Sequence, residues 1–313
     1  MCGICGLINY GHNSTFFQLN HIKTMMTSLL QESGIRGSDA TGICIAPRTS
    51  KAILLKDNEA AREFVMRIDY NRILNTKVNE VNNFKFMLGH TRSEIIGTHK
   101  DNNNNHPIVA NKVIGVHNGT LTNHNALFEK YRENDKIKRA GEVDSEIIFR
   151  LLDFYLQSHS IEEAVQIVTQ KLLGGFSCAF FSLARSQYVT LFGGNSPDIY
   201  LMDFRDHHVM AFASTELILK GAIKGNPIFR NPTAELSIDP YTGIRINTED
   251  GSIHMFTTKD IINKNIITAD KVAAVTSAFK THLTGGAHSP TNGCGWPANI
   301  SSQLEIPLKE IPF

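Results

Sequence analysis

The order of predicted secondary-structure elements restricts the fold of this sequence more than any other feature. Segments with strand and helix character follow one another in blocks, and strands dominate from residue 176 onward. Strict alternation is typical of a parallel sheet, whereas blocks favour an α+β arrangement with antiparallel sheets. A chain of 313 residues is long enough for one large domain, or for one domain with an appendage.

Hydrophobic spacing and turn signals locate the individual elements. Apolar residues recur at helical spacing between residues 16 and 32, which predicts an amphipathic helix. Asn118-Gly119 is a strong hairpin signal, and the polar stretch 71–83 is typical of a loop. The other predicted strands are 3–10, 41–46, 52–56, 84–90, 113–116, 176–183, 188–192, 199–202 and 209–213, and the other predicted helices are 58–68, 144–156 and 160–172.

Composition excludes several classes of function. The 31 basic and 30 acidic residues nearly balance, which argues against nucleic acid or an anionic membrane as the main partner. No apolar run approaches the ~18 residues of a membrane span, and the start lacks the pattern of a signal peptide. The five cysteines are odd in number, which suits a reducing compartment, so we expect a cytoplasmic protein. The Cys2-x-x-Cys5 pair has no second pair to complete a metal site, and no G-x-x-x-x-G-K phosphate loop occurs, so neither a metal nor a cofactor is expected.

The first six residues, MCGICG, offer a nucleophile together with its base. If Met1 is removed, Cys2 carries a thiol and a free α-amine on one carbon. The amine titrates near pH ~7.7–8.0 and the thiol near ~8.5, so the amine can take the thiol proton. A cysteine after the initiator methionine is more often a small buried residue, so the rest of the sequence has to decide between the two interpretations.

Four further segments contain residue types that are common in active sites. They are residues 36–43 (RGSDATGI), 89–92 (GHTR), 117–119 (HNG) and 144–146 (DSE). Each also has a purely structural interpretation, because an Arg–Asp pair can hold a turn, a cation can lie at the surface, Asn-Gly can form a hairpin and Asp can cap a helix. Their order and spacing along the chain are more specific than any one of them.

That order resembles the class II glutamine amidotransferase domain, which belongs to the N-terminal nucleophile hydrolases. The matching motifs are, in order, M-C-G-I-x-G, R-G-x-D-x-x-G-I, G-H-T-R, H-N-G and D-S-E, and weaker similarity occurs at 105–107, 174–176 and 212–216. The resemblance covers roughly residues 2 to 225. It implies a four-layer αββα sandwich, in which two antiparallel sheets lie between helix layers.

The resemblance also implies roles for six residues. Cys2 would attack the side-chain amide of glutamine, and the Asn118 side chain and the Gly119 backbone N–H would stabilise the oxyanion. Arg92 offers a bidentate fork to the substrate carboxylate, and Asp144 a carboxylate to its ammonium. Arg36, the last of the six, is expected to support the N-terminal residue.

The loop after Arg92 departs from the family pattern. The family usually has an aromatic residue and a Thr after the arginine, where this chain has Ser93-Glu94-Ile95-Ile96, so the loop that covers glutamine is altered. His90 and His106 are interpreted as structural residues. We predict an amidotransferase domain over residues 2–235, and a C-terminal extension over 236–313 that is strand-rich and then loosely ordered.

Three functions are consistent with this sequence. The first is a glutaminase that supplies ammonia to a partner synthase, docked through the tail around Trp296. The second is a stand-alone hydrolase of γ-glutamyl amides, which the altered loop would suit. The third is a binding or regulatory homologue without turnover, although a binding protein needs no oxyanion hole.

Overall fold

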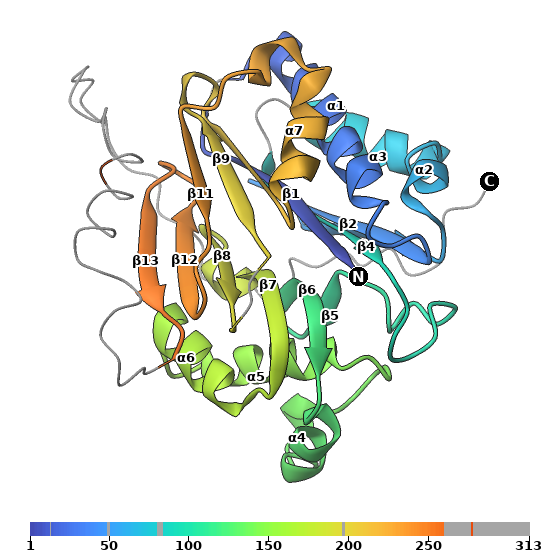
Figure 1. Cartoon of the computed structure of the whole chain (residues 1–313), viewed down its shortest axis with the longest axis vertical. Coiled ribbons are helices and arrows are strands. Elements are labelled where there is room, and N and C mark those ends of the chain that lie inside the picture. The colour runs from blue at the N-terminus through green and yellow to red at the C-terminus, as the bar shows by residue number, and fades with distance from the viewer. Residues whose placement is uncertain (13, 49–50, 80–83, 196–197, 260–276, 278–313) are drawn as a thin grey trace.

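A computed structural model describes residues 1–259 except 13, 49–50, 80–83 and 196–197, and it also describes residue 277. Two sheets, in which all pairs of neighbouring strands are antiparallel, form the centre of the fold (Figure 1). The seven-stranded sheet has the order β11-β9-β10-β1-β4-β2-β3, and the six-stranded sheet has the order β13-β12-β8-β7-β6-β5. The strands are β1 (Gly3–Asn9), β2 (Ala40–Pro47), β3 (Ile53–Asp57), β4 (Phe84–Arg92), β5 (Ile108–Ala110), β6 (Val113–Leu121), β7 (Gly174–Ser182), β8 (Tyr188–Gly193), β9 (Tyr200–Phe204), β10 (Val209–Ala213), β11 (Ala234–Ser237), β12 (Thr242–Asn247) and β13 (Ile253–Thr257).

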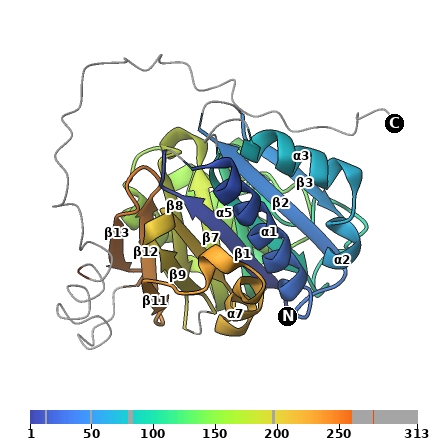
Figure 2. The ribbon, with the colours of Figure 1, turned by 90° about the horizontal axis from the view of Figure 1, so that it is seen from above.

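Helices cover the outer face of each sheet (Figures 1 and 2). On the seven-stranded sheet these are α1 (Phe16–Ser33), α2 (Ala61–Phe64), α3 (Ile68–Asn79) and α7 (Glu216–Lys224), and on the six-stranded sheet they are α4 (His124–Lys130), α5 (Ser145–Tyr155) and α6 (Ile161–Lys171). Three apolar clusters fill the spaces between the layers, one under each helix layer and one between the sheets. The predicted α+β fold with four αββα layers is therefore confirmed.

Strand β1 shows how the sequence produces this layering. Its alternate side chains point to opposite faces of the sheet. Cys5 and Leu7 pack against the helix layer, and Ile4 and Ile8 pack between the two sheets. Both faces of β1 are buried, so the strand lies in the middle of the seven-stranded sheet, between β10 and β4. This central position fixes the place of Cys2, which directly precedes the strand.

Two local predictions were wrong. Asn118-Gly119 does not form a hairpin turn, because both residues lie inside β6 and pair with Ser177 and Phe176 of β7. The predicted loop 71–83 is largely occupied by α3, which the low hydrophobicity of its sequence concealed. In both cases tertiary packing overrides a local signal.

The region after residue 235 contributes strands to both sheets. Residue 235 itself lies in β11, which pairs with β9, and β12 and β13 extend the six-stranded sheet from β8. A family-domain boundary at 235 stays a prediction. The tail around Trp296 lies outside the described residues. Within the described part, no helix is both long and apolar enough to span a bilayer.

Candidate active site

Cys2 lies where the start of β1 meets the end of β4. Gly3 pairs with Thr91 near the end of β4, and Ser93 is the first residue after that strand. The backbone N–H of Ser93 donates to Cys2 Sγ at 3.3 Å. Burial raises the pKa of the Cys2 thiol, and the Ser93 N–H, the N-terminal charge and Arg92 partly offset that rise. The thiol therefore needs a base to react at neutral pH.

We expect the raised pKa to appear in the pH dependence of Cys2 alkylation. The thiolate is the reactive form, so the rate of iodoacetamide modification should still be rising at pH ~8.5, where an ordinary thiol begins to level off. Cys5, Cys44 and Cys178 are fully buried and should stay unmodified in the folded protein. Peptide mass mapping follows each cysteine separately, and Cys2→Ala is the control. A rate at Cys2 that levels off below pH 8 would contradict the prediction.

Arg36 acts on the backbone of Cys2 rather than on its thiol. Its Nε donates to the Cys2 carbonyl oxygen at 2.7 Å, and its Nη2 donates to Asp198 Oδ2 at 3.1 Å. The Arg36 side chain is 12% exposed, whereas that of Asp198 is 47% exposed. Arg36 thus connects the backbone of Cys2 to the loop after β8.

Asn118 and Gly119 lie near the end of β6, in the neighbouring sheet. Asn118 is buried, and its Nδ2 donates to Ser214 Oγ at 2.7 Å. Gly119 has φ +129°, and a Cβ at this position would lie 2.0 Å from the carbonyl oxygen of Gly175. Only glycine fits this backbone conformation and this close contact.

Arg92 is buried and holds the loop that follows it. Its Nη1 donates to Asn105 Oδ1 at 2.9 Å, and its Nη2 donates to the carbonyl oxygens of Ile96 and Gly97. These contacts order the segment whose sequence departs from the family pattern. Arg92 has five N–H donors, so these bonds leave donors for a substrate carboxylate.

Asp144 joins the start of α5 to the end of β6. Its Oδ2 accepts from the Leu121 backbone N–H at 2.7 Å, and its side chain is buried. It occupies the N-cap position of α5, but its side chain makes no capping hydrogen bond there. The charges of Arg92 and Asp144 both act on the pKa of the Cys2 thiol, in opposite directions.

Three buried histidines lie behind these residues. His90 Nε2 contacts the His117 carbonyl oxygen at 3.1 Å, and His117 Nδ1 contacts Ser145 Oγ at 2.7 Å. The rings of His90 and His106 lie 4.1 Å apart, and burial lowers the pKa of all three histidines. Burial therefore favours the neutral form of each ring. Within the described residues, no group of three or more His, Cys, Asp or Glu side chains could hold a metal ion.

Sequence reasoning missed Ser214, Asn105 and Asp198 as members of this site. Ser214 and Asn105 lie in segments with weak family similarity, which was the only available signal for them. Asp198 lies in a loop without any motif. Each acts on a site residue through a contact between segments far apart in the chain.

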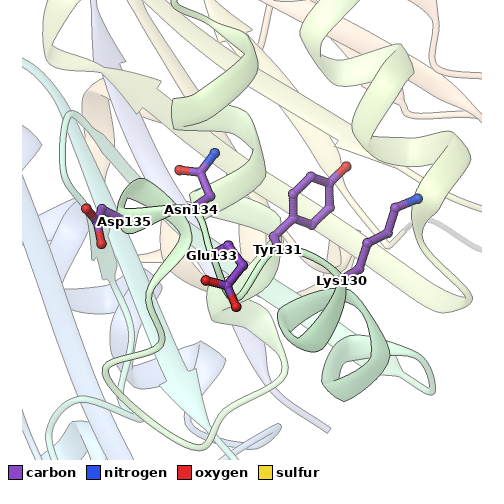
Figure 3. A pocket seen from close by; sticks show the side chains of 5 residues that line it. All are labelled: Lys130, Tyr131, Glu133, Asn134 and Asp135. Carbon is purple, nitrogen blue, oxygen red and sulfur yellow. The ribbon is translucent and has the colours of Figure 1, made fainter.

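A surface pocket at the end of α4 is separate from this site. It has a volume of about 360 Å³ and is lined by charged and polar side chains (Figure 3). These are Lys130, Tyr131, Glu133, Asn134 and Asp135. The pocket shares no residue with the group around Cys2.

Comparison with known proteins finds a family and several relatives to which the chain is similar. Residues 90–220 match the profile of a family described as a glutamine amidotransferase domain. This segment contains Arg92, Asn118, Gly119, Asp144 and Ser214. This segment of the chain is thus similar to glutamine amidotransferase domains.

Particular relatives make the comparison more specific. The chain is 28% identical over 179 residues to glutamine–fructose-6-phosphate aminotransferase (isomerizing) from Wigglesworthia glossinidia brevipalpis, which covers 56% of this chain and 26% of that protein. It is 27% identical over 200 residues to the same enzyme from Francisella tularensis, with coverages of 63% and 29%. The chain thus spans about a quarter of the length of these relatives.

Solved structures share the fold. Glutamine phosphoribosylpyrophosphate amidotransferase from B. subtilis superposes with a TM-score of 0.58 at 17% identity, over 85% of this chain and 50% of that chain. A structure described as the allosteric regulatory enzyme of purine biosynthesis gives a TM-score of 0.60, also at 17% identity, over 84% and 50% of the two chains.

Proposed function

We propose that this chain hydrolyses the side-chain amide of glutamine, with Cys2 as the nucleophile. The observation that carries the proposal is the grouping of unlike charges around one thiol. The buried cation Arg92 directly precedes Ser93, whose N–H donates to Cys2 Sγ at 3.3 Å, and the charges of Arg92 and of the buried anion Asp144 both act on the pKa of that thiol. Free glutamine carries one carboxylate and one ammonium, so the two charges complement its backbone while the thiol meets its side chain.

The reaction would begin with removal of Met1, which is 77% exposed. The freed α-amine of Cys2 takes the thiol proton, and the thiolate attacks the amide carbon. Asn118 Nδ2–H and the Gly119 backbone N–H stabilise the oxyanion of the tetrahedral intermediate. The C–N bond then breaks, the α-ammonium returns its proton to the leaving ammonia, and a γ-glutamyl thioester remains. Water hydrolyses the thioester to glutamate and restores the thiol.

Purified protein should release glutamate and ammonia from glutamine in equal amounts, and its intact mass should show loss of Met1. An active protein that retains Met1 would contradict the role of the Cys2 amine. A protein that has lost Met1 yet binds glutamine without releasing glutamate would favour the binding or regulatory function.

Arg92→Lys is expected to raise KM for glutamine by more than about tenfold while changing kcat less. Lysine keeps the charge but not the planar fork, and it cannot serve Asn105 and the loop carbonyls while also pairing with a carboxylate. Steady-state kinetics measure both constants, and the exposed Arg62→Lys is the matched control. An unchanged KM would place carboxylate recognition elsewhere.

We further propose that the ammonia passes to a synthase partner. The relatives have names that pair glutamine with a second substrate, fructose-6-phosphate or phosphoribosylpyrophosphate. The chain matches about a quarter of the length of these aminotransferases, which supports a glutaminase domain that works with a separate synthase. Residues 2–235 would form that domain, and free Cys5, Cys44 and Cys178 support a reducing, cytoplasmic location.

One observation favours a second function, hydrolysis of larger γ-glutamyl amides. Ser93, beside the thiol, is small where related domains usually have an aromatic residue, so a leaving group larger than ammonia would find more room. Comparing kcat/KM for glutamine and for γ-glutamyl ethylamide separates the two. A preference for the ethylamide would establish the second function.

A further inference from the structure

Ser214 connects the two strands that carry the reacting groups. It directly follows β10 and is fully buried. Its Oγ accepts from the Ile4 backbone N–H at 2.7 Å and from Asn118 Nδ2 at 2.7 Å. Ile4 is two residues from Cys2 on β1, and Asn118 belongs to β6 in the other sheet. One hydroxyl therefore spans the space between the sheets at the level of Cys2.

The hydrogen bonds of Ser214 also fix which atom of the Asn118 amide faces it. A serine hydroxyl has one hydrogen to donate and can accept two hydrogen bonds. The Ser214 hydroxyl lies 3.3 Å from the Ile4 carbonyl oxygen and donates to it. It can then only accept from Asn118, so the atom that faces it is the amide nitrogen.

This orientation matters for the oxyanion. An amide group carries two N–H donors on one side and a carbonyl oxygen on the other. With one N–H bound to Ser214, the second N–H stays available to a developing negative charge. A flipped amide would present its oxygen there and repel the oxyanion.

We infer that Ser214 is a positioning residue for the reaction, and this inference rests on the proposed function. It sets the orientation of the Asn118 amide and its distance from the strand that carries Cys2. It touches no reacting atom itself. Ser214 lies 96 positions from Asn118 in the sequence, so the connection exists only in the folded protein.

Ser214→Ala should lower kcat for glutamine about 10- to 100-fold, because a small displacement of a catalytic donor slows the reaction strongly. KM should change by less than about threefold, because Arg92 and Asp144 remain in place. Ser182→Ala is the matched control, because Ser182 is also buried and also accepts a hydrogen bond from a backbone N–H, that of Ala184. Ser182 is the last residue of β7 and pairs with Val113, whereas Asn118 pairs with Ser177. Ser182→Ala should leave kcat unchanged.

A double-mutant cycle distinguishes positioning from a general loss of stability. In an Asn118→Ala background, the amide is absent, so adding Ser214→Ala should cost less than about threefold in kcat. An equal fold-loss in both backgrounds would overturn the inference. So would a Ser214→Ala protein with unchanged kcat.

The Asn118 side-chain amide gives a readout that does not need activity. Its two N–H resonances, assigned by their loss in Asn118→Ala, should shift and exchange faster with water in Ser214→Ala. If the wild-type protein is active and the Asn118 resonances are the same in Ser214→Ala as in the wild type, this inference alone would be overturned. A wild-type protein without glutaminase activity would instead overturn the proposed function, and shifted resonances would then still establish that Ser214 holds the amide.

Discussion

Replacing Cys2 with alanine is expected to lower kcat for glutamate release by roughly 10⁴- to 10⁶-fold. The substitution removes the sulfur that would form the thioester. Cys5, Cys44 and Cys178 are fully buried and cannot replace it. Some rate above the uncatalysed reaction should remain, because the donors of Asn118 and Gly119 stay in place. A glutamate dehydrogenase-coupled assay measures the loss.

The same variant should keep its fold. Cys2 is partly exposed, and the hydrogen bonds of its sulfur are with the backbone of Ser93, so we expect the free energy of unfolding to change by less than ~1 kcal/mol. Glutamine should still raise the melting temperature, because Arg92 and Asp144 are intact. Chemical and structural effects are therefore separable at this position.

Cys5→Ala is the matched control on the same strand. Its sulfur packs in the core under α1, so truncation should cost about 1 kcal/mol of stability and leave the glutaminase rate within about twofold of the wild type. Cys2→Ala should thus lose activity and keep its stability, whereas Cys5→Ala should lose stability and keep its activity. A Cys2→Ala protein that keeps a rate within tenfold of the wild type would place the nucleophile elsewhere.

The layers of this fold were predictable because their signals are local and repeated. The spacing of Leu19, Ile22, Met26 and Leu29 predicts α1 almost to its ends, and Thr15 caps it. The capping box of Ser160 and Glu163 marks the start of α6. Such signals depend on residues three or four positions apart, which a sequence shows directly.

The contacts that build the site were not predictable in the same way. Ser214 meets Ile4 across 210 positions and Asn118 across 96, and Arg36 meets Asp198 across 162. No periodicity encodes such pairs. The motifs identified candidate residues, but the topology decides that β1, β4, β6 and β10 bring them to one place.

The failed hairpin prediction and the site have a common cause. Asn-Gly signals a turn because both residues tolerate positive φ. In this fold that tolerance is used within a strand, where Gly119 has φ +129° and β7 continues to pair beyond it. The sequence correctly indicated a residue with positive φ, but it placed that residue in a hairpin turn instead of a strand.

Gly119→Ala is accordingly expected to damage both stability and catalysis. Its φ of +129° is strained for any residue with a Cβ, and the added methyl would lie 2.0 Å from the Gly175 carbonyl oxygen and 2.9 Å from Phe176 Cα. Because backbone surrounds the methyl, relief requires β6 to move away from β7. We expect a loss of roughly 2–4 kcal/mol in the free energy of unfolding, measured by urea denaturation.

The catalytic part of the effect follows from the same movement. Under the proposed mechanism the Gly119 N–H stabilises the oxyanion, so its displacement should lower kcat about 10²- to 10³-fold at temperatures below the melting temperature of the variant. Gly175→Ala is the matched control one register position along on β7, because its added Cβ would meet only Asn195 Oδ1, at 3.9 Å. That variant should keep both stability and kcat. If Gly119→Ala were as active as Gly175→Ala, the Gly119 N–H would not be an oxyanion donor, and Asn118 would have to stabilise the intermediate without it.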